Sequence, residues 1–193
     1  MLLIKPNSLE LNACIEYYLT LCRTKGQSIN TVQVKSSTLK QFECWSIANG
    51  VAFTDKINLD WLDNYQHYLY QYRKARDKEP LCRATIRYRL TAVKVFVRTL
   101  FIKGVLLKNT TEYFELPTTG RRLPKPILSE AEIEKIMSQT EYYGLRGIRD
   151  RAVMETYYAS GIRRFELGQL TLQDIDFDLL QLRVNQGKGY KDR

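Results

Sequence analysis

The most informative part of this chain is the stretch Tyr158-Ala-Ser-Gly-Ile-Arg-Arg-Phe-Glu-Leu-Gly-Gln-Leu-Thr-Leu-Gln-Asp-Ile-Asp176, followed by Gly187-Lys-Gly-Tyr-Lys-Asp-Arg193. The first segment contains a helix break at Gly161, an arginine at Arg163 and an acid three residues later at Glu166. The second places Lys188 between two glycines, after a strand-like run at 180–184. Fixed cations of these two kinds are what a site that handles phosphate groups requires.

The order and spacing of these residues resemble the tyrosine recombinase (phage integrase) family, especially its bacterial Xer-like members. By this resemblance, Arg163 corresponds to the family's first catalytic arginine, Lys188 to its β-hairpin lysine, and Glu166 to the acid that supports the site. Glu166 is three residues from Arg163, so on a helix it could orient the guanidinium. Arg164 and Phe165 replace the small residues usual in the family, which leaves open whether Arg163 or Arg164 enters the site.

The chemistry that the resemblance implies explains these residue types. A tyrosine attacks a DNA phosphodiester, and the transition state carries extra negative charge and an alkoxide leaving group. Arginine can hold two phosphate oxygens with its planar fork, whereas a buried lysine can give up a proton to the leaving group. The reaction needs no cofactor and no metal. We accordingly expect neither, and the sequence has no P-loop or zinc-ligand cluster.

The family completes its site downstream of the lysine with a His-x-x-Arg segment, a further histidine or tryptophan, and the nucleophilic tyrosine. The sequence given ends at Arg193, its one histidine is His67, and Tyr190 lies too close to Lys188 to be that nucleophile. We therefore expect an incomplete enzyme. Two other classes stay open, namely a catalytically inactive DNA-binding regulator and an interaction fragment that joins other recombinase protomers in a synaptic complex.

The charge of the chain is distributed unevenly. Residues 1–110 hold 17 basic and 8 acidic side chains, whereas residues 111–193 hold 13 of each, so the whole net charge of +9 belongs to the first part. Such asymmetry is typical of a polyanion-binding module beside a charge-balanced one. Double-stranded DNA is the expected partner.

Helical periodicity dominates the first hundred residues. Apolar side chains step by three and four from Leu11 to Cys22, from Leu62 to Tyr72 and from Ile86 to Leu100, and Leu39, Phe42 and Trp45 suggest one more helix. This predicts a bundle of about four helices, which resembles the family's SAM-like core-binding domain.

The last helix of that bundle carries the DNA-contact hypothesis. A stripe of Arg87, Thr91, Lys94 and Arg98 lies beside its apolar face, and Arg83 lies at its start. The simpler interpretation is a solvated basic face, but the local excess of eleven basic over two acidic side chains in residues 73–108 favours DNA. Contacts of this kind give affinity and register, not a base code.

Residues 116–126 contain three of the five prolines and have no apolar period, so they are expected to be a linker in which Arg121 and Arg122 could touch the DNA backbone. The resulting division is a helical DNA-binding domain at 1–110, a linker at 111–126, and part of an α+β catalytic domain at 127–193. In that last part, Ser129 and Glu132 form a capping box before a helix, and 147–159 is predicted to be the next helix. The fold class is therefore mainly α.

The cysteines and the hydropathy of the chain indicate the compartment in which the protein resides. Cys14, Cys22, Cys44 and Cys82 have no metal-ligand spacing and are expected to be small buried apolar residues. The apolar run at 93–107 carries three cations, which excludes a membrane span. A reduced cytoplasm fits both observations.

Overall fold

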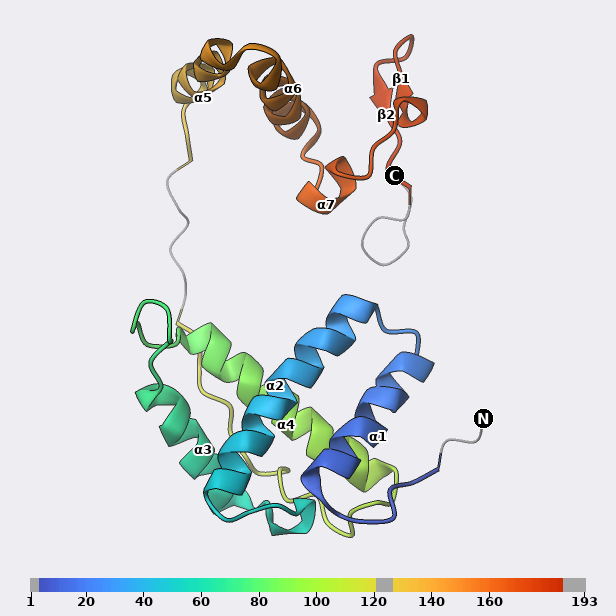
Figure 1. The fold of residues 1–193 in the computed structure, drawn as a ribbon, viewed down its shortest axis with the longest axis vertical. Helices are drawn as coiled ribbons and strands as arrows, with labels where there is room; N and C mark the ends of the chain where they lie inside the picture. Colours follow the sequence, from blue (N-terminus) through green and yellow to red (C-terminus); the bar gives the residue numbers. More distant parts are fainter. Residues whose placement is uncertain (1–3, 121–126, 186–193) are drawn as a thin grey trace. The chain divides into compact units, whose positions relative to one another are not determined.

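The computed structural model describes residues 4–120 and 127–185, and the chain divides into two compact units, Met1–Arg122 and Leu123–Arg193. We call them the amino-terminal unit and the carboxy-terminal unit. The described elements are α-helices, short 3-10 helices and one two-stranded sheet (Figure 1). The expected mainly α fold is confirmed.

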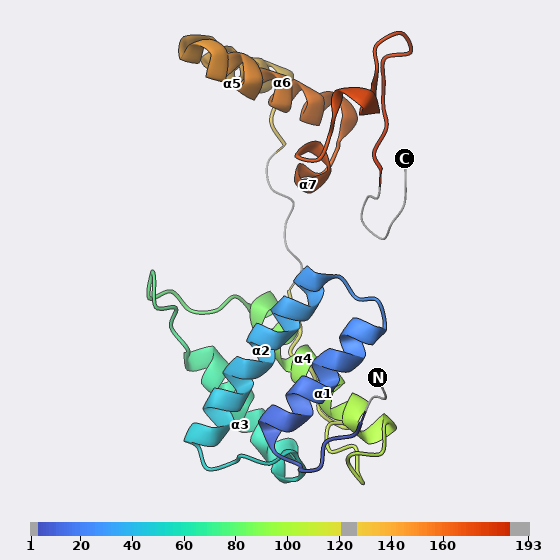
Figure 2. The ribbon, with the colours of Figure 1, turned by 45° about the vertical axis from the view of Figure 1, so that its right-hand side comes forward.

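The amino-terminal unit is a bundle of four helices. These are α1 (Leu11–Thr24), α2 (Ile29–Ala48), α3 (Leu59–Gln71) and α4 (Arg83–Ile102), with a 3-10 turn η1 (Thr54–Lys56) between α2 and α3 (Figures 1 and 2). Two of the helices begin at side-chain caps: the hydroxyl of Ser28 accepts from Thr31 N, and the amide oxygen of Asn58 accepts from Trp61 N at 2.8 Å. Such caps satisfy amides that the first helical turn leaves unpaired.

The core of this unit is made by the apolar faces that the periodicity predicted. Tyr18 on α1 packs edge-on against Phe96 on α4 at 5.6 Å between ring centroids, and Phe42 on α2 does the same with Tyr65 on α3 at 4.8 Å. Edge-on pairs of this kind add to the free energy gained by burying the rings. All four helices thus contribute to one core.

The segment after α4 returns across the bundle. Thr111 is fully buried and Phe114 belongs to the same hydrophobic core, while Leu116 packs against its edge. The expected linker of residues 111–126 therefore begins with residues that pack on the bundle.

The carboxy-terminal unit contains α5 (Glu130–Ser138), η2 (Gln139–Tyr143), α6 (Gly144–Ser160), α7 (Arg164–Leu167), η3 (Leu172–Asp174), β1 (Ile175–Asp176) and β2 (Gln181–Leu182). The predicted capping box of α5 is present, with Glu132 Oε2 accepting from Ser129 N at 2.8 Å. The strands are antiparallel, and Ile175 pairs with Leu182. Gly147 lies so close to the carbonyl of Thr140 that a Cβ would have no room there.

The expectation for the cysteines is half wrong. Cys14 and Cys22 are buried on the core face of α1, but Cys44 and Cys82 are exposed. Cys44 lies one residue before Trp45 on the outer side of α2, and Cys82 precedes the first turn of α4. Across the described residues, no helix is both long and apolar enough to span a bilayer.

Candidate functional site

The local fold around Arg163 is set by the end of α6. Gly161 terminates the helix in the left-handed conformation, with φ of 61°, and its N–H donates to Tyr157 O at 2.9 Å. Glycine favours this conformation because it has no Cβ. The chain then extends through the buried Ile162, and α7 begins after Arg163.

Arg163 and Glu166 form an ion pair across the first turn of α7. Glu166 Oε1 accepts from Arg163 Nη1 at 2.7 Å, and Glu166 Oε2 accepts from the backbone N–H of Arg163 at 3.0 Å. The Glu166 side chain is only 6% exposed, whereas that of Arg163 is 52% exposed. The buried carboxylate therefore holds one edge of a guanidinium that faces solvent.

This arrangement leaves the guanidinium able to bind an anion. Its hydrogen bonds within the described residues use Nη1, so the N–H groups of Nε and Nη2 have no partner there. A guanidinium can present two parallel donors to the oxygens of one phosphate. The expected orienting role of Glu166 thus has a geometric basis.

Arg164 has a different environment. It is exposed at the first position of α7, and its side chain makes no ion pair within the described residues, while Phe165 is 74% exposed beside it. Of the two arginines that the sequence left open, Arg163 is the one that the buried acid orients. Lys188 and Tyr190 lie outside the described residues.

The aspartates after α7 have local structural roles. Asp174 Oδ2 accepts from Thr171 N at 2.9 Å, and this bond is the main reason that the pKa of Asp174 is lowered. Asp176 Oδ1 accepts from Asp178 N and Leu179 N in the turn between the strands. Asp174 therefore caps the start of η3, and Asp176 orders the turn between β1 and β2.

On α4, three members of the expected DNA-contact stripe have partners inside the protein. Arg87 Nη1 donates to Pro117 O at 2.8 Å, and Lys94 Nζ donates to Phe114 O at 2.6 Å and to Glu112 O at 3.5 Å. The Thr91 hydroxyl donates to Arg87 O at 2.7 Å. The two cations therefore fasten segment 112–117 to α4, a role that helix periodicity could not reveal.

Two further members of the expected set are exposed on α4. Arg83 and Arg98 both lie on the surface of α4, and Arg121 and Arg122 fall outside the described residues. Among the cations at positions 5–108, the ion pairs within the described residues engage only Lys56 and Lys74. The positive charge of the amino-terminal unit is thus largely uncompensated, as in a surface that binds a polyanion.

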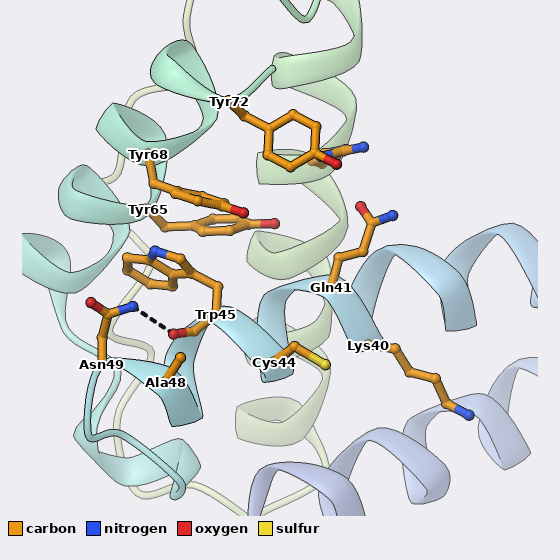
Figure 3. Close-up of a pocket in the computed structure, with 10 residues that line it drawn as sticks. Lys40, Gln41, Cys44, Trp45, Ala48, Asn49, Tyr65, Tyr68 and Tyr72 are labelled. Atoms are coloured by element: carbon orange, nitrogen blue, oxygen red, sulfur yellow. Dashed lines mark hydrogen bonds between the residues drawn. The ribbon is translucent and has the colours of Figure 1, made fainter. Parts of the chain in front are cut away.

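Several aromatic residues line a groove, although sequence reasoning used Trp45, Tyr65 and Tyr72 only for packing and did not name Tyr68. Trp45, Tyr65, Tyr68 and Tyr72 line one groove together with the cations Lys40 and Arg89 (Figure 3). The available signal was the choice of tyrosine, rather than leucine, at positions 65 and 68 on one side of α3 and at its C-cap Tyr72.

Comparison with known proteins agrees with these features. Residues 10–116 match the phage integrase SAM-like domain, and residues 126–193 match the phage integrase family. The chain is 31% identical over 185 residues to tyrosine recombinase XerC 2 of Ralstonia nicotianae, covering 96% of this chain and 53% of that protein. It is 32% identical over 169 residues to tyrosine recombinase XerD of Pseudomonas aeruginosa, covering 88% and 53%.

The match with tyrosine recombinase XerC of Lacticaseibacillus casei is similar, with 34% identity over 166 residues, 86% of this chain and 53% of the relative. The chain thus spans about half the length of these curated relatives. These matches agree with the helical bundle, the uncompensated positive charge and the arginine held by a buried acid. The chain belongs to the phage integrase family of tyrosine recombinases.

Proposed function

We propose that this protein is a site-specific DNA recombinase or integrase, which in its complete form cleaves and rejoins DNA strands through a 3′-phosphotyrosine. It acts on double-stranded recombination sites together with other recombinase protomers, in the cytoplasm. The observation that carries the proposal is the Arg163–Glu166 pair, in which a buried carboxylate holds an exposed guanidinium. Family membership supplies the reaction, and this pair supplies a group suited to its transition state.

Arg163 would act on the phosphodiester under attack. Its free N–H groups would bind non-bridging oxygens, whose charge grows in the transition state, and Glu166 would keep the fork from rotating away. Lys188 would protonate the leaving oxygen, as the resemblance implies. Because Arg163 interacts most strongly with the transition state, its loss should lower cleavage much more than DNA affinity.

The amino-terminal unit would hold the duplex. Arg83 and Arg98 are exposed cations on α4, and they are the members of the expected set with the freest access to phosphates. Arg87, Thr91 and Lys94 remain in the proposal with a smaller share, because each already has a partner within the protein. Arg121 and Arg122 are also retained as backbone contacts.

The experiment uses these 193 residues continued by the carboxy-terminal half of a Xer-type relative. The protein is incubated with a nicked suicide duplex, and the covalent protein–DNA adduct is quantified on a denaturing gel. Arg163→Ala should lower the adduct about 100-fold or more, with duplex affinity nearly unchanged. Arg164→Ala is the matched control and should leave most of the adduct.

Each other outcome has a definite meaning. Full activity of Arg163→Ala with loss in Arg164→Ala would show that the neighbouring arginine enters the site. If the unsubstituted protein binds duplex DNA but forms no adduct, the recombinase proposal fails and a DNA-binding regulator is favoured.

A further inference from the structure

Asp174 closes the base of the hairpin that β1 and β2 form in the carboxy-terminal unit (Figure 1). Its backbone oxygen accepts from Arg183 N at 2.8 Å, and its Oδ1 accepts from Asn185 Nδ2 at 2.6 Å. Within the described residues the two strands pair at only two positions, and so short a hairpin has little stability of its own. The two bonds to Asp174 therefore hold the exit of β2 beside the entry of β1.

The same carboxylate also holds the segment that precedes it. Asp174 Oδ2 accepts from Thr171 N at 2.9 Å and from Thr171 Oγ1 at 2.8 Å. These bonds lower the pKa of Asp174, so the carboxylate is charged at neutral pH. Hydrogen bonds to a charged acceptor are stronger than those to a neutral one. One side chain thus ties the turn after α7 to the residues that follow β2.

The exit of β2 and helix α7 line one small cavity. Its volume is about 270 Å³, and its lining includes Glu166 of α7 together with Asp174 and Asn185. Val184, which also lines the cavity, is buried. Glu166 is the acid that holds Arg163. The bonds of Asp174 therefore determine where the chain passes the candidate site.

The last described residue, Asn185, is close in sequence to the expected proton donor. Lys188 follows it by three residues, and three residues of extended chain span at most about 11 Å. A group that gives up a proton must lie within hydrogen-bond reach of the acceptor, and a displacement of about 1 Å can lower a rate about 100-fold. The bond at Asn185 consequently limits where the lysine can reach.

From these contacts we infer that Asp174, with Asn185 as its partner, is a positioning residue for the proton transfer from Lys188 during DNA cleavage. The inference rests on the proposed function and deepens it. In that reaction the tyrosine oxygen bonds to phosphorus, the bond from phosphorus to the 5′ oxygen breaks, and the proton of Lys188 Nζ passes to that oxygen. Asp174 touches none of the reacting atoms and acts through the lysine.

Two substitutions separate this role from the capping of η3. Asn185→Ala removes the bond to Oδ1 and leaves both bonds from Thr171 intact. Thr171→Val is the matched control, because it removes one bond to Oδ2 on the side of the local turn and keeps the bond from the backbone N–H. Asp174→Ala removes the side-chain bonds on both sides.

The experiment uses the protein extended by the carboxy-terminal half of a Xer-type relative and two nicked suicide duplexes. One duplex has an ordinary phosphodiester at the cleavage position, and the other has sulfur in place of the 5′ bridging oxygen. Because the pKa of a thiol is only about 8.5, the sulfur leaves as a thiolate and needs no proton from the protein. Thermal melting checks that each variant is folded.

On the ordinary duplex, Asp174→Ala should form the covalent adduct about 100-fold more slowly and Asn185→Ala about tenfold more slowly. On the sulfur-containing duplex, both should react at nearly the rate of the unsubstituted protein. Lys188→Ala should behave in the same way. Arg163→Ala should be slow on both duplexes, because the charge on the non-bridging oxygens is present in either case.

Hydrogen–deuterium exchange tests the bond at Asn185 without the reaction. In the 193-residue chain, Asn185→Ala should speed exchange of the amides at 181–185, and Thr171→Val should leave it unchanged. Unchanged exchange in Asn185→Ala would show that Asn185 does not hold the exit of β2, and the inference would fail.

The remaining outcomes are equally definite. If Asn185→Ala cleaves ordinary DNA normally, or stays slow on the sulfur-containing duplex, Asp174 does not act through proton transfer and the inference is wrong. An equal loss in Thr171→Val would assign the effect to the local turn. If Asp174→Ala does not fold, Asn185→Ala decides. If the unsubstituted extended protein forms no adduct with either duplex, the proposed function itself fails.

Discussion

Replacing Lys94 with methionine should loosen segment 112–117 from the bundle. Lys94 Nζ donates to Phe114 O at 2.6 Å and more weakly to Glu112 O at 3.5 Å, and the variant removes both bonds while keeping the apolar stem. A hydrogen bond from a charged group contributes about 1.5–3 kcal/mol. Because Lys94 is only half-buried, we expect the lower part of this range.

A loss of about 1.5 kcal/mol in local stability corresponds to roughly tenfold faster opening of the segment. Hydrogen–deuterium exchange of peptides covering residues 111–118 measures this directly. The core contact of Phe114 should keep the segment from detaching fully. Exchange elsewhere in the bundle should not change.

Arg98→Met is the matched control. Arg98 is an exposed cation on the same helix, and it has no ion pair among the described residues, so its loss should not alter exchange at 111–118. It should instead weaken DNA binding. If Lys94→Met leaves the exchange of this segment unchanged, the carbonyl contacts do not stabilise it, and Lys94 would be free for phosphate.

Other predictions concern the core and the thiols. Phe96→Ala should destabilise the amino-terminal unit by about 3–5 kcal/mol in a denaturant titration, because its ring is fully buried against Tyr18. The control Phe101→Ala, on the exposed side of α4, should lower the free energy of unfolding by well under half as much. In the native chain, iodoacetamide should label Cys44 rapidly and Cys14 slowly, because burial excludes the reagent and raises the pKa of the Cys14 thiol. Equal labelling rates measured by mass spectrometry would show that Cys14 is not enclosed as described.

Much of the fold follows from local rules. These rules predicted a helix correctly where a regular apolar period, a capping box or a single glycine determines its position. The 3.6-residue period located α1, α3 and α4, the Ser129–Glu132 box marked the start of α5, and Gly161 marked the end of α6. Helix α2 was predicted only around residues 39–45, although it spans Ile29–Ala48. Its first half carries few apolar residues in register, and the helix as a whole packs against α1 and α4.

The functional surface was less accessible to sequence reasoning, because it depends on contacts between distant segments. The pairing of Arg163 with Glu166 follows from helical spacing, and the structure contains it. Lys94 and Arg87, by contrast, bind carbonyls 20 and 30 residues further along the chain, which no helical pattern encodes. The exposure of Cys44 likewise depends on which side of α2 faces the core, so the apolar character of cysteine alone led to a wrong prediction.

The most direct test of the account is the salt dependence of duplex DNA binding by the 193-residue chain. If Arg83 and Arg98 each neutralise one phosphate, the slope of log Kobs against log salt should be about −1.8 or steeper, and affinity should fall roughly 12-fold or more between 50 and 200 mM salt. The value follows from two exposed cations of α4 without ion pairs among the described residues. An affinity that stays flat over this range would contradict the claim that the uncompensated charge of the amino-terminal unit binds the DNA backbone.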